Sequence, residues 1–280
     1  MVNVTPFCGT NKYIFKSEKD YHEDISIKNL TGLIETNVID AINQEIIRYI
    51  GDFYVLNYNL LLDLLVRSYA LAINKEKVEK RLIRLRQLGV INMYQQENNE
   101  QCVYVLSEGA SIYYYLQEKG EKRKRQSFTA KKELEGMFIN HIIPINSLFI
   151  YAKNINGAAI KRKPIVNLFV RLFVLDLQWI KVNIATRAIR RGDDVKKVID
   201  ELEQISYKYY RGTSYYTVLL CEDSKHILDV NNEIRDNEIK VPDNMYFTTD
   251  RESMFGFLSG LYGRDSNNAN TVNSIHFKLS

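Results

Sequence analysis

Six basic side chains fall within a short stretch of the N-terminal half of the chain. They are Lys75, Lys77, Lys80, Arg81, Arg84 and Arg86, and the same stretch contains only two acidic residues, Glu76 and Glu79. The stretch therefore carries a net charge of +4, equal to the formal charge of the whole chain. Lysine and arginine bind phosphate oxygens, and arginine also makes paired hydrogen bonds to guanine. Because a charge run is more often a solvated helix face, its position among the predicted elements decides between the two interpretations.

The spacing of apolar residues places this charge run on a helix. Val78, Leu82 and Leu85 recur at three and four residue intervals and form one apolar stripe. Asn74 is a suitable N-cap, and Gly89 ends the segment. With the stripe in a core, the side chains predicted to contact DNA from this helix are Lys75, Lys77, Lys80, Arg81 and Arg84. Reversing Arg81 and Arg84 to glutamate is predicted to abolish DNA binding without unfolding the chain.

A hairpin is predicted directly after this helix. Two runs of strand character, VINMYQ and CVYVL, are joined by the polar segment ENNEQ. The hairpin tip would approach DNA beside the helix with amides and a tyrosine rather than with cations. The predicted contact residues of the hairpin are Tyr94, Gln95, Gln96, Asn98 and Asn99.

The surrounding elements complete a recognisable order. A helix is predicted from Val38 to Ile50, ended by Gly51 as a left-handed cap, and a short apolar strand at 53–56 and a helix at 60–66 follow. Beyond the hairpin, Ser107 caps a last helix at 108–117. Helix, strand, helix, helix, hairpin and helix is the order of a winged helix-turn-helix, which inserts its recognition helix into the major groove. Residues 38–120 are therefore predicted to be a winged-helix DNA-binding domain.

The rest of the chain divides into four predicted parts. Residues 1–37 are an arm of unassigned role, and a charged bridge at 118–127 follows the winged helix. The cations Lys122, Arg123, Lys124 and Arg125 of that bridge either follow phosphates or are simply solvated.

Residues 128–262 alternate helix and strand and are predicted to be an α/β domain for partner contact or dimerisation. Residues 263–280 are predicted to be a loose polar tail. A helix is predicted at 195–210, and another between the strands YYTVLLCED and NMYFTTD. Phe128 to Ala152 is predicted to be one or two helices, broken at Pro144. Because a winged helix is followed by an α/β domain, the expected fold class is α+β overall.

Residues with catalytic chemistry give a weaker pattern. Asp223 and Lys225 have the acidic-x-Lys spacing of a metal-dependent nuclease, with Asp176 as an earlier carboxylate. They are more simply explained as strand-end surface charges, and His141 as a satisfied core histidine. Cysteines and histidines are scattered without metal-ligand spacing, and no glycine-rich phosphate loop is present. No enzyme activity, cofactor or metal is therefore predicted.

The N-terminus lacks the pattern of a signal peptide, and no apolar run approaches the roughly 20 residues that span a bilayer. A cytoplasmic protein without a membrane partner is expected.

Several stretches resemble the replication-relaxation family of Gram-positive plasmids and integrative elements. These are RLIRLRQLGVINMY with VYVLSEGA, then NHIIPIN, and near the end YYTVLLCED and MYFTTDRE. The resemblance covers residues 38 to about 258, and its motifs are loose. It implies a mobile-element protein with an N-terminal winged helix and a C-terminal domain related to nucleases, here in degenerate form.

The predicted function is therefore DNA binding that regulates transcription, replication or transfer of a plasmid, phage or integrative element. The predicted partners are double-stranded DNA and either a second copy of the chain or a replication or transfer protein. Two alternatives stay open, a metal-dependent nuclease or relaxation factor and a scaffold of a replication or conjugation complex.

Overall fold

The computed structural model describes residues 13–16, 24–69, 74–96, 101–119, 133–134, 136–152, 159–162, 169–176, 181–255, 260–264 and 272–275. These residues form two units, one ending at residue 139 and the other beginning at residue 140. Each unit has its own sheet, so the described chain is a mixture of α and β structure. None of the described helices is long and apolar enough to cross a membrane.

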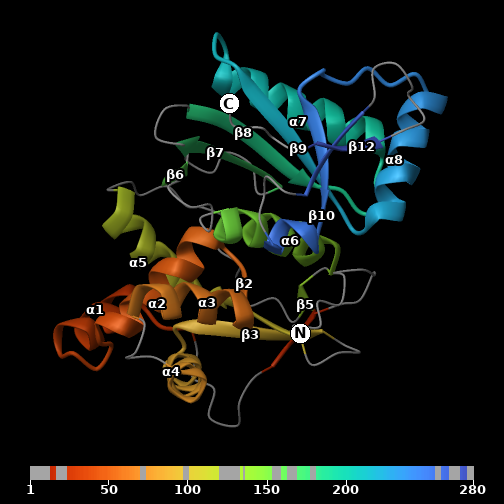
Figure 1. Ribbon diagram of the computed structural model, residues 1–280. Helices are drawn as coiled ribbons and strands as arrows, with labels where there is room; N and C mark the ends of the chain where they lie inside the picture. Colours follow the sequence, from red (N-terminus) through yellow and green to blue (C-terminus); the bar gives the residue numbers. More distant parts are fainter. Residues whose placement is uncertain are drawn as a thin grey trace. The chain divides into compact units, whose positions relative to one another are not determined.

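The N-terminal unit contains five described helices and one sheet (Figure 1). The helices are α1 (Ile27–Glu35), α2 (Ala41–Phe53), α3 (Tyr58–Tyr69), α4 (Lys75–Gln87) and α5 (Glu108–Lys119). The strands are β1 (Tyr13–Phe15), β2 (Leu56–Asn57), β3 (Ile91–Gln96), β4 (Cys102–Leu106) and β5 (Glu133–Leu134). From α2 to α5, the elements follow one another in the order predicted for residues 38–118.

The sheet of this unit is wider than the sequence predicts. Its strand order is β2-β4-β3-β1-β5, with β3 and β4 as the predicted antiparallel hairpin. Strand β1, from the predicted N-terminal arm, pairs antiparallel with both β3 and β5. The unit thus takes in residues on both sides of the predicted range 38–120. Pairing between strands about 80 residues apart leaves no local periodicity that sequence reasoning could detect.

Gly51 does not end α2, which corrects the prediction of a left-handed cap there. The helix continues to Phe53, and Tyr54 takes the positive φ, at 66°. A Cβ on Gly51 would lie 2.7 Å from the ring of Tyr114 on α5. The glycine is therefore needed inside the helix, where it lets that aromatic ring lie against the α2 backbone.

The C-terminal unit is built on a seven-stranded mixed sheet in the order β12-β11-β10-β9-β8-β7-β6. Its strands are β6 (Ala159–Arg162), β7 (Val170–Asp176), β8 (Lys181–Ala188), β9 (Tyr215–Cys221), β10 (Met245–Thr249), β11 (Leu261–Arg264) and β12 (Val272–Ile275). Its helices are α7 (Val195–Tyr210), α8 (Ser224–Asp236) and α9 (Glu252–Phe255), together with α6 (Gly136–Ala152), most of which belongs to this unit. Strands β8, β9 and β10 are parallel, and α7 and α8 connect them. The predicted helices at 195–210 and between the last two predicted strands are confirmed.

Helices cover both faces of this sheet (Figure 1). Leu172 on β7 and Ala185 on β8 belong to the core under α7 and α8. The neighbouring residue Phe173 points to the opposite face, where its ring lies 5.6 Å from that of Phe149 on α6. The parallel strands are thus enclosed between helices, as expected for strands linked by helical crossovers.

Two predictions for this half are wrong. Helix α6 is one continuous helix through Pro144, although a break was expected there. Strand β12 lies within 263–280, the range predicted to be a loose tail, and pairs antiparallel with β11. β12 lies at the edge of the sheet, where polar residues such as Asn273 and Ser274 are tolerated, so its sequence lacks the apolar pattern of a buried strand.

Candidate functional site

Helix α4 carries most of the predicted DNA-contacting side chains, and local chemistry explains where it begins. The side chain of Asn74 accepts a hydrogen bond from the backbone N–H of Lys77 at 2.9 Å, which is the predicted N-cap. Val78, Leu82 and Leu85 are buried, as their spacing predicts. Since these residues hold one face of α4 in the core, the polar face is turned outward.

Lys75, Lys77, Lys80 and Arg84 lie exposed on that outward face. Two of these lysines have an acidic neighbour one turn away. Lys80 Nζ lies 2.6 Å from Glu76 Oε1, and Lys75 Nζ lies 3.9 Å from Glu79 Oε1. Exposed pairs at this spacing contribute only about 0.3–0.5 kcal/mol, so an approaching phosphate can displace them.

Arg81 differs from the other cations of α4, and its prediction as a DNA contact is corrected. Its Nη1 donates to both carboxylate oxygens of Asp40 at 2.7 Å and to Oδ1 of Asn43 at 3.0 Å. Burial tends to raise the pKa of Asp40, but the hydrogen bond from Arg81 holds that pKa below its usual value. Arg81 thus attaches α4 to the first turn of α2. Its reversal to glutamate would disturb the fold, contrary to the prediction that it would not.

The hairpin contributes less surface than predicted. Tyr94 and Gln96 are buried, at 0% and 8% exposure, so both are wrong as DNA contacts. They are covered because β1 pairs with β3, which brings the ring of Phe15 to 5.5 Å from that of Tyr94. Gln95 is half-buried on the same strand. The remaining predicted contacts, Asn98 and Asn99 of the hairpin and Lys122, Arg123, Lys124 and Arg125 of the bridge, lie outside the described residues.

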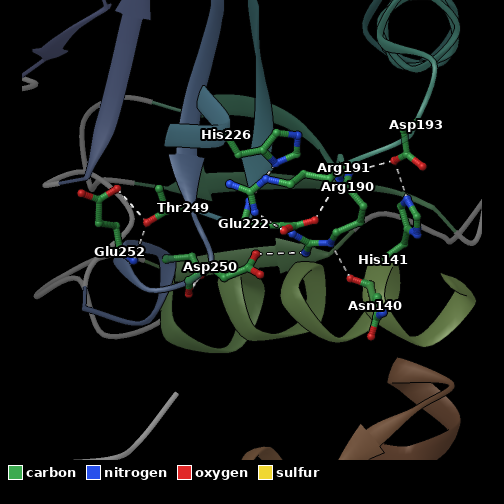
Figure 2. A network of polar contacts seen from close by, with 11 residues as sticks. Asn140, His141, Arg190, Arg191, Asp193, Glu222, His226, Thr249, Asp250 and Glu252 are labelled. Atoms are coloured by element: carbon green, nitrogen blue, oxygen red, sulfur yellow. Dashed lines mark hydrogen bonds and ion pairs between the residues drawn. The ribbon is translucent and has the colours of Figure 1, made fainter. Parts of the chain in front are cut away.

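A second concentration of polar side chains lies in the C-terminal unit, where the parallel strands β8, β9 and β10 end (Figure 2). The carboxyl ends of parallel strands meet at one edge of a sheet, and ligands commonly bind at such an edge. Arg190 and Arg191 follow β8, Glu222 and Asp223 follow β9, and Asp250 follows β10.

Arg190 joins α6 to the end of β10. Its Nε donates to the backbone carbonyl of Asn140 at 2.8 Å, and its Nη2 donates to Asp250 Oδ1 at 3.0 Å. Pro144 has no N–H, so the carbonyl four residues earlier, that of Asn140, lacks its normal helical partner. The arginine supplies the missing donor, which explains how α6 continues through a proline.

Both arginines of this network are paired with carboxylates. Asp250 is fully buried, and burial raises its pKa to about 6 in spite of the charge of Arg190. Arg191 Nη1 donates to Glu222 at 2.5 Å and its Nη2 donates to Asp223 at 2.8 Å. Each arginine therefore has a carboxylate partner, and the buried one, Arg190, is paired as a buried charge requires.

His141 belongs to the same network. Its Nε2 lies 2.7 Å from Asp193 Oδ2, which also accepts from the backbone N–H of Arg190 at 2.8 Å. Burial tends to raise the pKa of Asp193, but the hydrogen bond with His141 holds that pKa below its usual value. His141 is thus a buried and hydrogen-bonded histidine.

The three residues considered for a nuclease do not come together. Asp223 caps α8 by accepting from the backbone N–H of His226 at 2.8 Å, and its carboxylate is paired with Arg191. Asp176 ends β7, which runs antiparallel to β8, so it lies at the edge of the sheet opposite to Asp223. Lys225 is exposed on α8. Within the described ranges, no group of three His, Cys, Asp or Glu residues is placed to hold a metal ion.

Sequence reasoning missed the Arg190 network, although one signal was present. Charged residues follow each of the three parallel strands, in IRRGDD, CED and TDRE. The sequence predicts the strand ends YYTVLLCED and NMYFTTD, but it does not distinguish the strand preceding Arg190 from the apolar run before it. Without that strand, the convergence of three charged ends could not be deduced.

Comparison of the chain with known proteins does not help to assign either site. No model of a known protein family, no curated protein and no solved structure matches the chain. The likeness to the replication-relaxation family therefore remains a prediction, and the function has to be argued from the geometry.

Proposed function

We propose that the N-terminal unit binds double-stranded DNA as a winged helix, with α4 in the major groove. The order of elements from α2 to α5 supports this, together with the small antiparallel sheet β2-β4-β3 beside α4. In winged helix-turn-helix proteins, the helix that precedes the hairpin enters the major groove.

The outward face of α4 is the observation on which the proposal mainly rests. Lys77, Lys80 and Arg84 are exposed, and Lys75 lies exposed at the start of the helix. All four of these cations are suited to neutralise phosphates of the DNA backbone. Ile83, 44% exposed on the same face, is suited to contact with a thymine methyl group.

In this proposal the protein regulates transcription, replication or transfer of a mobile element. The C-terminal unit provides contact with a second copy or with a replication or transfer protein. A single winged helix buries a small interface on DNA, and pairing two of them raises affinity and specificity.

Charge reversal on α4 tests the proposal. The variant Lys77→Glu/Arg84→Glu is compared with Lys225→Glu/Lys240→Glu, which makes the same change of charge at exposed positions of the C-terminal unit. Fluorescence anisotropy with a labelled duplex, at fixed salt, measures the affinity of both variants and of the unchanged protein.

The proposal expects the α4 variant to lose duplex binding while the control variant keeps most of it, because Lys77 and Arg84 contact phosphates and Lys225 and Lys240 do not. Circular dichroism and thermal unfolding serve as the control that both variants are folded. Equal losses in the two variants would mean that net charge alone attracts DNA, and α4 would not be the recognition helix.

A further inference from the structure

A cavity of about 430 Å³ lies in the N-terminal unit, beside α2. Side chains from α1, α2, α3 and α5 line it. Ligand sites in proteins measure roughly 300–1,000 Å³ and combine apolar and aromatic walls with a few polar groups that orient the ligand. The cavity has this size, and the chemistry of its lining indicates which class of ligand it suits.

Three tyrosines form the aromatic part of the lining, Tyr69 from α3 and Tyr113 and Tyr114 from α5. Tyr114 is fixed in place, because a Cβ on Gly51 would lie 2.7 Å from its ring and its hydroxyl donates to Asp52. Tyr69 and Tyr113 are half-buried, so part of each side chain stays accessible. Such a lining favours a flat aromatic ligand, because aromatic rings pack well on one another, stacked or edge to face.

The two charged side chains of the lining, Glu45 and Arg48 on α2, are paired with each other. The guanidinium donates through Nε to Glu45 Oε2 at 2.8 Å and through Nη2 to the other carboxylate oxygen. These hydrogen bonds hold the pKa of Glu45 below its usual value, so the pair stays ionised near neutral pH. An ionic ligand would lose hydration without gaining an unmatched opposite charge from the described lining residues. The cavity therefore favours a neutral ligand.

Neutral hydrogen-bonding groups complete the lining. They are the amides of Gln44 and Gln117 and the hydroxyls of Tyr69 and Tyr113. The Nε2 of Gln44 donates to the carbonyl of Ile39 at 3.2 Å, so Oε1 is the atom that this amide can offer to a ligand. Amides and phenols bind hydroxyl and carbonyl groups without the help of a full charge. They suit an aromatic ligand with a substituent of that kind.

We propose that this cavity binds a neutral, flat aromatic molecule that carries a hydroxyl or carbonyl group. The rings of the ligand contact the tyrosines, and its substituent forms a hydrogen bond with the neutral polar groups of the lining. The binding does not depend on DNA, so it stands or falls separately from the proposed function.

Three naphthalene derivatives serve as probes, because they share the two fused rings and differ in the charge of one substituent. They are 2-naphthylmethanol, which is neutral, 2-naphthoate, which is an anion, and 2-naphthylmethylammonium, which is a cation. Isothermal titration calorimetry with the full chain measures the affinity for each probe.

Two variants test whether the probe occupies this cavity. Ala41, the first residue of α2, is exposed and lines the cavity, so Ala41→Phe fills the space without removing a contact. Its control is Ser224→Phe, since Ser224 is also an exposed first residue of a helix behind an aspartate cap. Tyr113→Leu removes a ring from the lining, and Tyr207→Leu is its control at an exposed tyrosine of the C-terminal unit.

We expect 2-naphthylmethanol to bind and each ion to bind at least about fivefold more weakly. Ala41→Phe should lower the affinity for the alcohol by about tenfold, and Tyr113→Leu by about fivefold, the range of one aromatic pair. Both controls should keep the affinity of the unchanged protein. Failure of the alcohol to bind, equal binding of either ion, or equal affinity of a variant and its control would each overturn the proposal. Should a variant not fold, the other variant and the three probes on the unchanged protein decide the matter.

Discussion

At the scale of single residues, Arg190 and Asp250 show how a buried ion pair serves the fold. The guanidinium replaces the donor that Pro144 lacks, and the carboxylate holds the guanidinium in place. The sequence around Arg190 or Asp250 does not indicate that these two residues pair, because they are far apart in the chain. From the sequence, Pro144 is expected to interrupt the helix. The donor that compensates for its missing N–H is Arg190, about 50 positions from the carbonyl of Asn140, and cannot be found from the local sequence.

The raised pKa of Asp250 makes a prediction about pH. Its folded-state pKa of about 6 lies above the value of an exposed aspartate, so between those two values the folded state binds more protons than the unfolded state. The contribution of Asp250 to stability is therefore greatest at low pH and decreases as pH rises through 6. Between pH 7.5 and 5, the free energy of unfolding of the unchanged protein should rise by about 1 kcal/mol relative to Asp250→Asn.

Urea unfolding at the two pH values measures this difference. The comparison with Asp250→Asn is necessary because a second group changes stability in the same pH range. Burial lowers the pKa of His226, so the folded state loses stability as the pH falls and the unfolded state takes up the proton more readily. An identical pH dependence in the two proteins would show that Asp250 does not titrate there.

The link between Arg190 and Pro144 makes a second prediction. Arg190→Lys removes the donor to the Asn140 carbonyl and should lower the free energy of unfolding by about 2 kcal/mol. Pro144→Ala returns a backbone N–H to that carbonyl, so in the Pro144→Ala background the same substitution should cost about 1 kcal/mol less. A double-mutant cycle from urea unfolding gives this coupling, and additive effects would contradict the link.

At the scale of elements, the sequence predicts best those features that depend on residues close together in the chain. The boundaries of α4 and α7 follow from capping residues and apolar periodicity, and the buried positions Val78, Leu82 and Leu85 were deduced correctly. The pairing of β1 with β3 could not be deduced, because it depends on contact between distant segments. That pairing is also why Tyr94 is buried and not available for the predicted contact.

The sequence predicts the cations of α4 as one group, whereas the structure pairs Arg81 within the fold and leaves Lys75, Lys77, Lys80 and Arg84 exposed. Helical spacing places Arg81 nearer to the apolar stripe than Arg84, but it cannot show that a carboxylate lies there. The difference comes from Asp40, which is brought to Arg81 by the packing of α2 against α4.

This division predicts opposite effects for two matched substitutions. Arg81→Gln should lower the free energy of unfolding by about 1 kcal/mol more than Arg84→Gln, because it breaks a partly buried, charge-assisted contact. Arg84→Gln should in turn weaken duplex binding more than Arg81→Gln does. Thermal unfolding and anisotropy on the same two proteins check both effects, and the reverse order in either measurement would contradict the assigned roles.

At the scale of the whole molecule, each unit is stabilised by its own sheet and helices, and the proposed tasks are divided between them. DNA contact is assigned to the N-terminal unit, and partner contact to the C-terminal unit. The charge balance supports this division only locally, since the formal charge of the whole chain is +4 and exposed cations lie in both units, but Lys75, Lys77, Lys80 and Arg84 lie together on the single helix α4. The position of the charge, and not its total, carries the argument.

The salt dependence of duplex binding tests this account most directly. If Lys75, Lys77, Lys80 and Arg84 each neutralise one phosphate, the logarithm of the binding constant should fall with the logarithm of salt concentration with a slope of about −3.6. Replacing Lys77 and Arg84 by glutamine should reduce the slope to about −1.8, while glutamine at Lys225 and Lys240 should leave it unchanged. A slope that is the same in all three proteins would show that α4 does not contact the DNA backbone.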